Sequence, residues 1–282
     1  MTIATAAGPM RGATVEELRR AWQAVAAGAF RSEAVRHSVT GRTAPAAQWT
    51  RAQGEQTVAI VGCVGSAGAT TLALSAALAA PGPVRVVECC SATASGLASA
   101  ATAELGVDPS GWSQARREHV RLERASEVLT VVDDVPLPTA VEPGTLTFLD
   151  AGWEVGQLHA GASWLSQAVA AADLLVLVTP ATTPGMRRLG VALGLLTELA
   201  GPVLDERVVV AVRGPRRRRW GRGVEGAAGP FLQRVLQSGA VVEIPECRDI
   251  AVTGLDSRPL PHALVAAAGQ VREHVRPHTR IP

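Results

Sequence analysis

Residues 57–80 read TVAIVGCVGSAGATTLALSAALAA, and this stretch decides the fold. It opens with an apolar, β-branched run that is typical of a buried strand. A turn with Gly65 and Gly68 follows, and Thr70 and Thr71 then open a helix rich in alanine and leucine. A strand, a glycine-rich loop and a helix in this order point backbone N–H groups at one spot. That arrangement binds anions such as phosphate.

The loop lacks the lysine of the standard phosphate-binding pattern G-x-x-x-x-G-K-[ST]. With Gly68 and Thr70 aligned on that pattern, the lysine position holds Ala69 and the first glycine position holds Cys63. The chain contains no lysine, so all 27 of its Lys and Arg residues are arginine. The sequence therefore predicts a phosphate loop without its usual cation.

The length of the chain allows either one large domain or a domain with an appendage. Its 282 residues are 47% hydrophobic, which allows a substantial core. A formal net charge of +2 leaves only local arginine clusters as binders of polyanions. The cysteines and histidines show no metal-ligand spacing, so no metal site is predicted. We find no signal-peptide pattern and no apolar run of about 18 residues, and we expect a soluble, cytoplasmic protein with no transmembrane segment.

Strand and helix patterns alternate from Thr57 onward, which predicts an α/β fold with a doubly wound, mostly parallel sheet of the P-loop NTPase type. Near-continuous apolar runs such as LLVLVT at 174–179 suit a parallel sheet that is covered on both faces. The expected strands are 57–62, 84–89, 119–123, 128–132, 145–150, 173–179, 207–213 and 240–244. The expected helices are 69–80, 94–105, 161–171, 185–199, 227–238 and 260–275.

The chain divides by composition into two units, 1–56 and 57–282. The first unit is expected to hold a helix at about 14–28 followed by a polar linker, as an N-terminal helical extension of the α/β domain. Apolar residues recur at helical spacing along that helix. They are Leu18, Trp22 and Val25. This stripe is expected either to pack on the α/β domain or to dock on a partner.

Ligands of an open α/β sheet bind beyond the carboxyl ends of the strands. The run LTFLD ends on Asp150 and is followed by Gly152, the usual shape of a Walker B element, whose carboxylate positions Mg²⁺. The run VRVVE ends on Glu88, and Cys90 comes two residues later. The last expected strand leads into IPE at 244–246.

Taken in order, these features resemble the MinD/ParA family of P-loop ATPases, the deviant Walker A branch of the SIMIBI class, over about residues 57–275. The family loop K-G-G-x-G-K-T-T corresponds to VGSAGATT at 64–71. The resemblance implies that the two family lysines fall on Val64 and Ala69, and that the carboxylate which helps to activate water falls on Cys90. It implies a degenerate nucleotide site. The residues of that site are Gly65, Gly68, Ala69, Thr70, Thr71, Asp150, Pro245 and Glu246.

The lost charges bear on activity, because the P-loop lysine supplies much of the transition-state stabilisation in phosphoryl transfer. We therefore expect no catalytic residues and a degenerate ATPase. The site is expected either to bind ATP or ADP with Mg²⁺ weakly or to bind no nucleotide, in which case the glycines would serve only a tight turn. An alternative is an arginine in place of the lysine, with Arg187, Arg213 and Arg248 as candidates.

A dense basic run follows the expected strand at 207–213. Arginines beside an aromatic residue suit phosphate backbones and base stacking, but they equally suit an acidic protein, anionic lipid or solvent. The run comprises Arg213, Arg216, Arg217, Arg218, Arg219, Trp220 and Arg222. A second basic run at 116–121 is interleaved with acidic residues and is expected at a solvated strand edge.

The interpretation that accounts for most of these features is a non-hydrolysing MinD/ParA-like scaffold or adaptor that positions a larger assembly. The resemblance implies plasmid partition, conjugative transfer or a secretion apparatus, with a homodimer or a protein partner, and it suggests a mobile element. One alternative is a slow or non-standard ATPase of the same family. The other is a nucleic-acid-binding protein that uses the loop at 213–222 without regard to base sequence.

Overall fold

A computed structural model describes residues 48–90, 94–201 and 206–275, together with Glu16, Arg19 and Gln23. The chain divides into two compact units, Met1–Pro45 and Ala46–Pro282. In the first unit the three described residues are helical and exposed. The predicted apolar stripe of that helix lies outside the described residues. It consists of Leu18, Trp22 and Val25.

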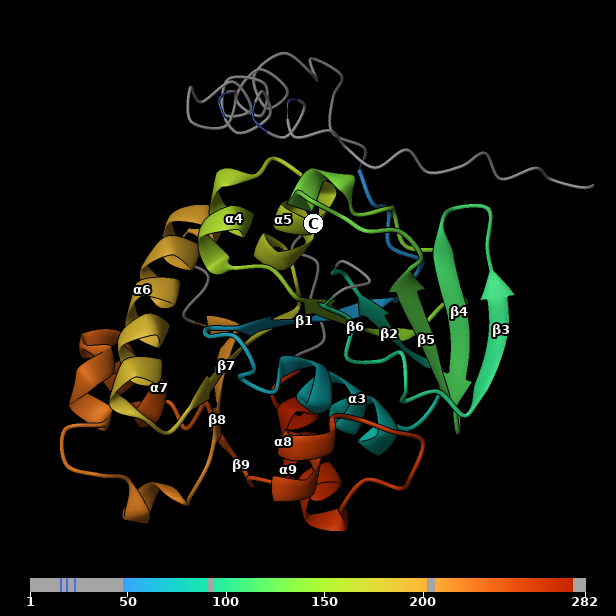
Figure 1. Cartoon of the computed structure of the whole chain (residues 1–282). Coiled ribbons are helices and arrows are strands. Elements are labelled where there is room, and N and C mark those ends of the chain that lie inside the picture. Colours follow the sequence, from blue (N-terminus) through green and yellow to red (C-terminus); the bar gives the residue numbers. More distant parts are fainter. Residues whose placement is uncertain are drawn as a thin grey trace, which may run out of the picture. The chain divides into compact units, whose positions relative to one another are not determined.

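The second unit is built on a nine-stranded sheet in the order β3-β4-β5-β2-β6-β1-β7-β8-β9 (Figure 1). All neighbouring strands from β5 across to β9 are parallel, while β4 is antiparallel to both β3 and β5. The prediction of a mostly parallel α/β sheet is thus confirmed. The strands are β1 (Gln56–Gly62), β2 (Val84–Glu88), β3 (Ala103–Val107), β4 (Trp112–Arg117), β5 (Val120–Ala125), β6 (Leu146–Ala151), β7 (Leu174–Pro180), β8 (Val208–Arg213) and β9 (Val241–Ile244).

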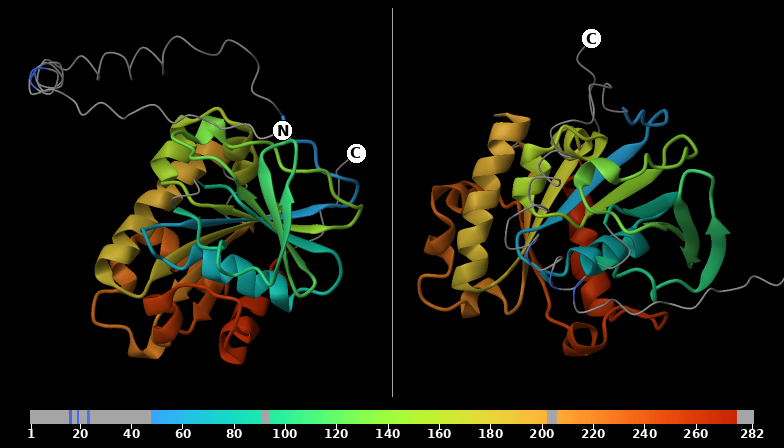
Figure 2. Two further views of the ribbon diagram at one scale, coloured as in Figure 1. Left: turned by 45° about the vertical axis from the view of Figure 1, so that its right-hand side comes forward. Right: turned by 45° about the horizontal axis from the view of Figure 1, so that its top comes forward.

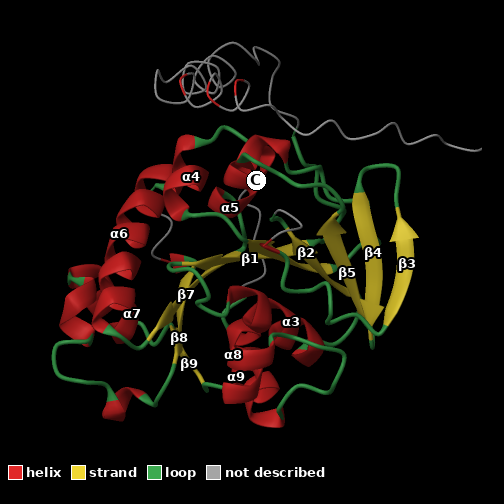
Figure 3. Cartoon of the chain, in the orientation of Figure 1, coloured by secondary structure: helices red, strands yellow, loops and turns green. Residues whose placement is uncertain are grey.

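Helices cover both faces of the sheet (Figures 2 and 3). One face carries α3 (Ala69–Ala79), α8 (Arg248–Thr253) and α9 (His262–Glu273). The other carries α4 (Val155–Ala160), α5 (Trp164–Ala170), α6 (Thr183–Ala200) and α7 (Pro230–Gln237). Side chains alternate along β1, so Val58 and Ile60 join the α3–α9 core while Ala59 and Val61 join the α4–α7 core. In the described ranges, no helix is both long and apolar enough to cross a bilayer.

The edge of the sheet beyond β2 differs from the prediction. The prediction of a helix at 94–105 is wrong, because residues 103–107 form strand β3, which pairs with β4. Neither β3 nor β4 was predicted from the sequence. The backbone N–H groups of Gly96 and Leu97 donate to the Glu88 carboxylate at 2.7 and 3.0 Å, so this segment caps a side chain and does not start a helix. Gly106 has φ +95°, which also excludes helical continuation.

The strand expected at 128–132 is also wrong, because β5 occupies the place beside β2. Two tryptophans bind the segment at 135–137, just after the predicted strand, and keep it out of the sheet. The indole N–H of Trp164 donates to the carbonyl of Val135, and that of Trp112 donates to the carbonyl of Leu137, each at 2.7 Å. A residue whose carbonyl accepts from a buried indole is fixed in position and cannot slide into a ladder.

Arg117 corrects the expectation that the basic run at 116–121 is solvated. Its side chain is buried and donates to the carbonyls of Ala100 and Asp256 at 3.1 and 2.6 Å. The β4–β5 hairpin thereby attaches to the segment between α8 and α9.

A buried ion-pair network joins residues 48–55, which were expected to belong to the linker, to the sheet. The Arg85 guanidinium on β2 lies 2.9 Å from Glu55 Oε1 and 3.3 Å from Glu123 Oε2, and each of the three side chains is at most 1% exposed. Removing one partner of such a cluster leaves uncompensated buried charge, which costs far more than the pair itself contributes.

We therefore predict that Arg85→Ala lowers the free energy of unfolding by about 3–5 kcal/mol, because Glu55 and Glu123 would lose their shared cation. Urea unfolding of the full chain measures this loss. The matched control is Arg258→Ala, which removes the solvent-exposed pair with Asp256 and should cost at most about 1 kcal/mol. Equal losses in the two variants would contradict the prediction.

Candidate functional site

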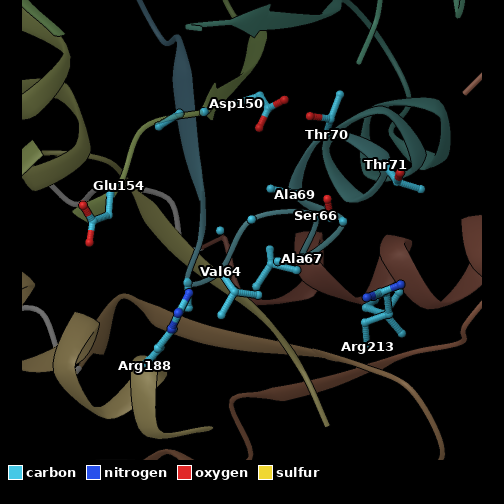
Figure 4. Close-up of a pocket in the computed structure, with 18 of the residues that line it drawn as sticks. Val64, Ser66, Ala67, Ala69, Thr70, Thr71, Asp150, Glu154, Arg188 and Arg213 are labelled. Atoms are coloured by element: carbon cyan, nitrogen blue, oxygen red, sulfur yellow. The ribbon is translucent and has the colours of Figure 1, made fainter. Parts of the chain in front are cut away.

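The glycine-rich loop at 62–71 forms one wall of a cleft at the carboxyl edge of the sheet (Figure 4). The Cys63 N–H donates to the Val178 carbonyl of β7 at 2.9 Å, which ties the start of the loop to the neighbouring strand. Gly68 caps α3 without a side-chain hydrogen bond. The first backbone N–H groups of an α-helix have no partner within the helix, so those of α3 are available to an anion in the cleft.

The backbone conformation requires glycine at one of the two loop positions, 68, but not at the other, 65. Gly68 has φ +98°, a conformation that favours glycine, and a Cβ there would lie 3.4 Å from Cδ of Arg213. Gly65 has no positive φ, and no atom lies within 4 Å of the place where its Cβ would stand. A tight turn therefore accounts for glycine at 68 but not at 65.

Asp150 stands at the end of β6 and faces Thr70 of α3 (Figure 4). It is 1% exposed, and neither carboxylate oxygen has a hydrogen-bond partner among the described residues. Burial, together with the nearby Glu88 carboxylate, raises its pKa to about 7, with the Thr70 side chain acting in the opposite direction. A buried carboxyl group without a partner is unfavourable and is satisfied by a proton or a cation.

Glu88 is the register partner of Asp150 across β2 and β6. Its carboxylate accepts hydrogen bonds from the Ser95 hydroxyl and from the N–H groups of Gly96 and Leu97. Burial raises its pKa, and these hydrogen bonds partly offset the shift. Glu88 is thus occupied in holding the segment after β2.

Cys90 occupies the position at which the resemblance places a water-activating carboxylate. The side chain is 5% exposed, and a Cβ on Gly152 would lie 2.6 Å from the Cys90 Cβ. Burial raises the pKa of the Cys90 thiol. A neutral thiol in this place cannot take a proton from water, so the position supplies no general base.

The cleft has a volume of about 1170 Å³, large for a small-molecule site. Its remaining walls are mostly apolar. They include Trp153, Val191 and Leu195 on one side and Ile244, Pro245 and Ile250 on the other. Two residues after β9 were predicted to belong to the nucleotide site. Pro245 lines the cleft, whereas Glu246 is not among its lining residues and lies with Oε1 3.6 Å from Nη1 of Arg213.

Among the described residues, two arginines line the cleft, Arg213 at the end of β8 and Arg188 on α6. Of the three arginines proposed from sequence, Arg187 and Arg248 are not among the described residues that line it. Arg188 was missed because neighbouring residues on a helix point about 100° apart, and the sequence alone did not fix which of the pair faces the sheet edge.

The rest of the basic run forms an exposed loop with a 3₁₀ turn at Arg217–Arg219. Arg217 is anchored, because its N–H donates to Glu243 Oε1 at 2.7 Å and its guanidinium pairs with Glu225. Trp220 is half-buried against the α4–α7 core and donates to the Pro215 carbonyl at 2.9 Å. The tryptophan is therefore committed to the fold and not free to stack on a base. Arg216, Arg218, Arg219 and Arg222 are exposed.

These residues fit the phosphate and Mg²⁺ portions of a nucleotide. The loop N–H groups suit phosphate oxygens, and the Thr70 hydroxyl with the unpartnered Asp150 carboxylate suits Mg²⁺, which takes few protein ligands and keeps water and phosphate oxygens. The part of the chain that the structure describes holds no cluster of three or more His, Cys, Asp or Glu side chains that could bind a metal ion unaided.

Solved structures of other proteins share this fold. A ParA family ATPase from Chlorobium tepidum TLS superposes with a TM-score of 0.53 at 14% identity, covering 78% of this chain and 99% of that chain. The chain has the fold of the ParA-family ATPases. An ATP complex of a Cyanothece McdA variant and apo McdA share this ParA-like fold, each with a TM-score of 0.51, 14% identity and 79% of this chain covered, and with 96% and 100% of their own chains covered. No protein-family model and no curated protein matches the sequence.

We predict that Asp150→Asn stabilises this ParA-like domain, and does so more at pH 7.5 than at pH 5. The folded-state pKa of about 7 lies above the ordinary value of 3.8. Stability from the protonated carboxyl is therefore complete below about pH 4 and is lost as the pH rises to about 7, because unfolding frees the group to ionise. The neutral amide escapes this loss, so its advantage should grow by about 2 kcal/mol between the two pH values.

Denaturant unfolding at the two pH values measures the difference, with Asp133→Asn, an exposed aspartate, as the control. A stabilisation that is the same at pH 5 and pH 7.5 would show that the Asp150 carboxylate has a partner in solution and is not held protonated.

Proposed function

We propose that this chain is a non-hydrolysing ParA-like scaffold or adaptor that positions a larger assembly. One observation carries the proposal. The anion-binding loop, Thr70 and the unpartnered Asp150 stand together in one cleft, whereas Ala69 and Cys90 bring no charge to it.

The uncharged positions separate binding from turnover. Mg²⁺-nucleotide, when bound, supplies a phosphoryl group whose charge must be stabilised during transfer, mainly by cations placed at that group. The Ala69 methyl group offers no such stabilisation, and the neutral Cys90 thiol cannot orient or deprotonate water. The loop N–H groups, Thr70 and Asp150 still suffice to hold ATP or ADP weakly, so the site supports binding without efficient hydrolysis.

The positioning role draws its support from the fold likeness to a ParA family ATPase and to McdA. We propose that the protein acts in the cytoplasm on plasmid partition, conjugative transfer or a secretion apparatus, as a homodimer or with a protein partner. The N-terminal stripe of Leu18, Trp22 and Val25 is our candidate for the partner contact, since a buried tryptophan commonly anchors an interface.

We predict that phosphate release from ATP with Mg²⁺ equals that of Asp150→Ala, because Ala69 supplies no charge to the transferred phosphoryl group and Cys90 supplies no base. A steady-state phosphate assay on both proteins measures this. Turnover in the unaltered chain that Asp150→Ala abolishes would refute the non-hydrolysing proposal and favour the slow ATPase.

Ala69→Lys should strengthen nucleotide binding by roughly tenfold or more, the effect of one charge-assisted hydrogen bond.

A second candidate function is nucleic-acid binding that ignores base sequence, and one observation favours it. The arginines at 216, 218 and 219 are exposed and, among the described residues, form no salt bridge, so their charge is available to a polyanion. The half-buried Trp220 argues for phosphate contacts and against base stacking as the mode of binding.

We predict that replacing Arg216, Arg218 and Arg219 with Gln flattens the salt dependence of duplex DNA binding, since each lost phosphate contact removes about 0.9 from the slope of log K against log salt. Binding measured across a salt series tests this. Arg217→Gln is the matched control, because Glu225 already pairs with that arginine. Unchanged slopes in the triple variant would remove this loop as a nucleic-acid surface.

A further inference from the structure

The missing lysine leaves the phosphate loop without a cation of its own, and Arg213 reaches that loop from another strand. Arg213 ends β8 and pairs in register with Pro180 of β7, the strand that also pairs with β1. The ends of β1 and β8 therefore lie at the same edge, two strands apart. From this position Arg213 lines the same cleft as the loop (Figure 4).

Contact with Gly68 fixes where the Arg213 side chain lies. Its Cδ stands 3.4 Å from the place that a Cβ on Gly68 would occupy, an ordinary contact distance, so the arginine side chain passes directly beside this glycine. The side chain is only 26% exposed. The guanidinium group is thus held beside the N-terminus of α3, where the unpartnered backbone N–H groups lie.

The hydrogen bonds that Arg213 does not make indicate what it binds. Its Nε is buried and has no partner among the described residues. Nη1 lies 3.6 Å from Glu246 Oε1, beyond hydrogen-bond distance, and that carboxylate is itself largely exposed. A buried donor without an acceptor is unfavourable. Arg213 and the first turn of α3 line the same cleft, and an anion placed beside Gly68 would accept hydrogen bonds from both.

Asp150 lies at the other end of the site and offers hydrogen-bond acceptors where Arg213 offers donors. Its two unpartnered oxygens are acceptors, and it lies with Thr70 on the side of the loop away from Arg213 (Figure 4). Unsatisfied donors at one end and unsatisfied acceptors at the other match a phosphate group and its Mg²⁺. Arg188, the other arginine of the cleft, is exposed on α6.

We infer that Arg213 is the cation that holds the phosphates of a nucleotide in this loop, in place of the lysine missing at Ala69. The inference rests on the nucleotide-binding part of the proposed function. Arg213 binds and positions the phosphate chain from the side opposite Asp150, so it restores affinity without placing a charge at the Asp150–Thr70 end. Glu246 competes for the same guanidinium group and sets how much of its charge the ligand feels.

Calorimetric titration of the full chain with Mg²⁺-ADP and with Mg²⁺ and a non-hydrolysable ATP analogue tests the inference. Arg213→Gln should weaken binding at least about tenfold, the loss of a charge-assisted hydrogen bond to phosphate. Arg216→Gln, three residues on and outside the cleft, is the matched control and should change affinity less than about twofold. Glu246→Gln should act in the opposite direction and tighten binding about two- to fivefold.

Rescue separates a phosphate contact from a general disturbance of the fold. Adding Ala69→Lys to Arg213→Gln should restore the affinity to at least that of the unaltered chain, because a lysine at 69 replaces the lost cation. Melting temperatures of all variants should agree within error. Failure of the lysine to rescue would mean that Arg213→Gln acts through the fold, and the inference would be wrong.

The outcomes also separate this inference from the proposed function. Nucleotide binding that Arg213→Gln leaves unchanged, or an absence of nucleotide binding by the unaltered chain, overturns the role of Arg213 and leaves a non-hydrolysing scaffold standing. Rapid ATP hydrolysis with binding that depends on Arg213 overturns the scaffold and leaves the role of Arg213 intact.

Discussion

Parallel pairing of β1 with β6 and β7 is the constraint on which the rest of the site depends. Strands that run in one direction end at one edge, so residues far apart in sequence meet there. The register pairs Ile60 with Asp150 and Asp150 with Glu88, while the next strands along carry Arg213 to the same edge. A shift of one residue would turn Asp150 to the opposite face of the sheet, because side chains alternate with a period of two.

Local patterns in the sequence predicted the parts of the fold that depend on local interactions. The strand, loop and helix at 57–80 were recoverable because an apolar run, glycines and a helical period follow one another directly. The helix expected at 94–105 failed because the N–H groups of Gly96 and Leu97 bind Glu88, a contact across the loop that no helical period reveals. The short helices α4 and α8 were missed for a related reason, since six residues are too few to show a period. Arg213 could be named from its strand end, but its contact with Gly68 depends on the order of strands in the sheet.

Asp150 shows that the site is not arranged for stability. Burial of an unpartnered carboxyl group costs free energy, and the adjacent Glu88 carboxylate adds to that cost. A hydrophobic residue in place of Asp150 would extend the apolar core between the sheet and α3. Gly152 packs so closely on Cys90 that a larger residue would not fit, which keeps the backbone after Asp150 close to the end of β2. A costly acidic group held beside the glycine-rich loop is an arrangement suited to holding a cation and an anion together, as our proposal requires.

The basic loop at 213–222 runs from the cleft to the protein surface and is held to β9 along the way. It begins at Arg213 inside the cleft, and its third and fifth residues already lie in solvent at Pro215 and Arg217. The Gly214 N–H donates to the Ile244 carbonyl at 3.0 Å, and Glu243 accepts from the Arg217 N–H at 2.7 Å, so β9 holds the loop at two points. Trp220 fixes its far end against the core. A ligand that moved Arg213 would couple the cleft to the exposed arginines only if the short segment between these anchors moved with it. Any such coupling is reciprocal, so a polyanion or acidic partner that engaged Arg218 and Arg219 would alter the affinity of the cleft by the same factor.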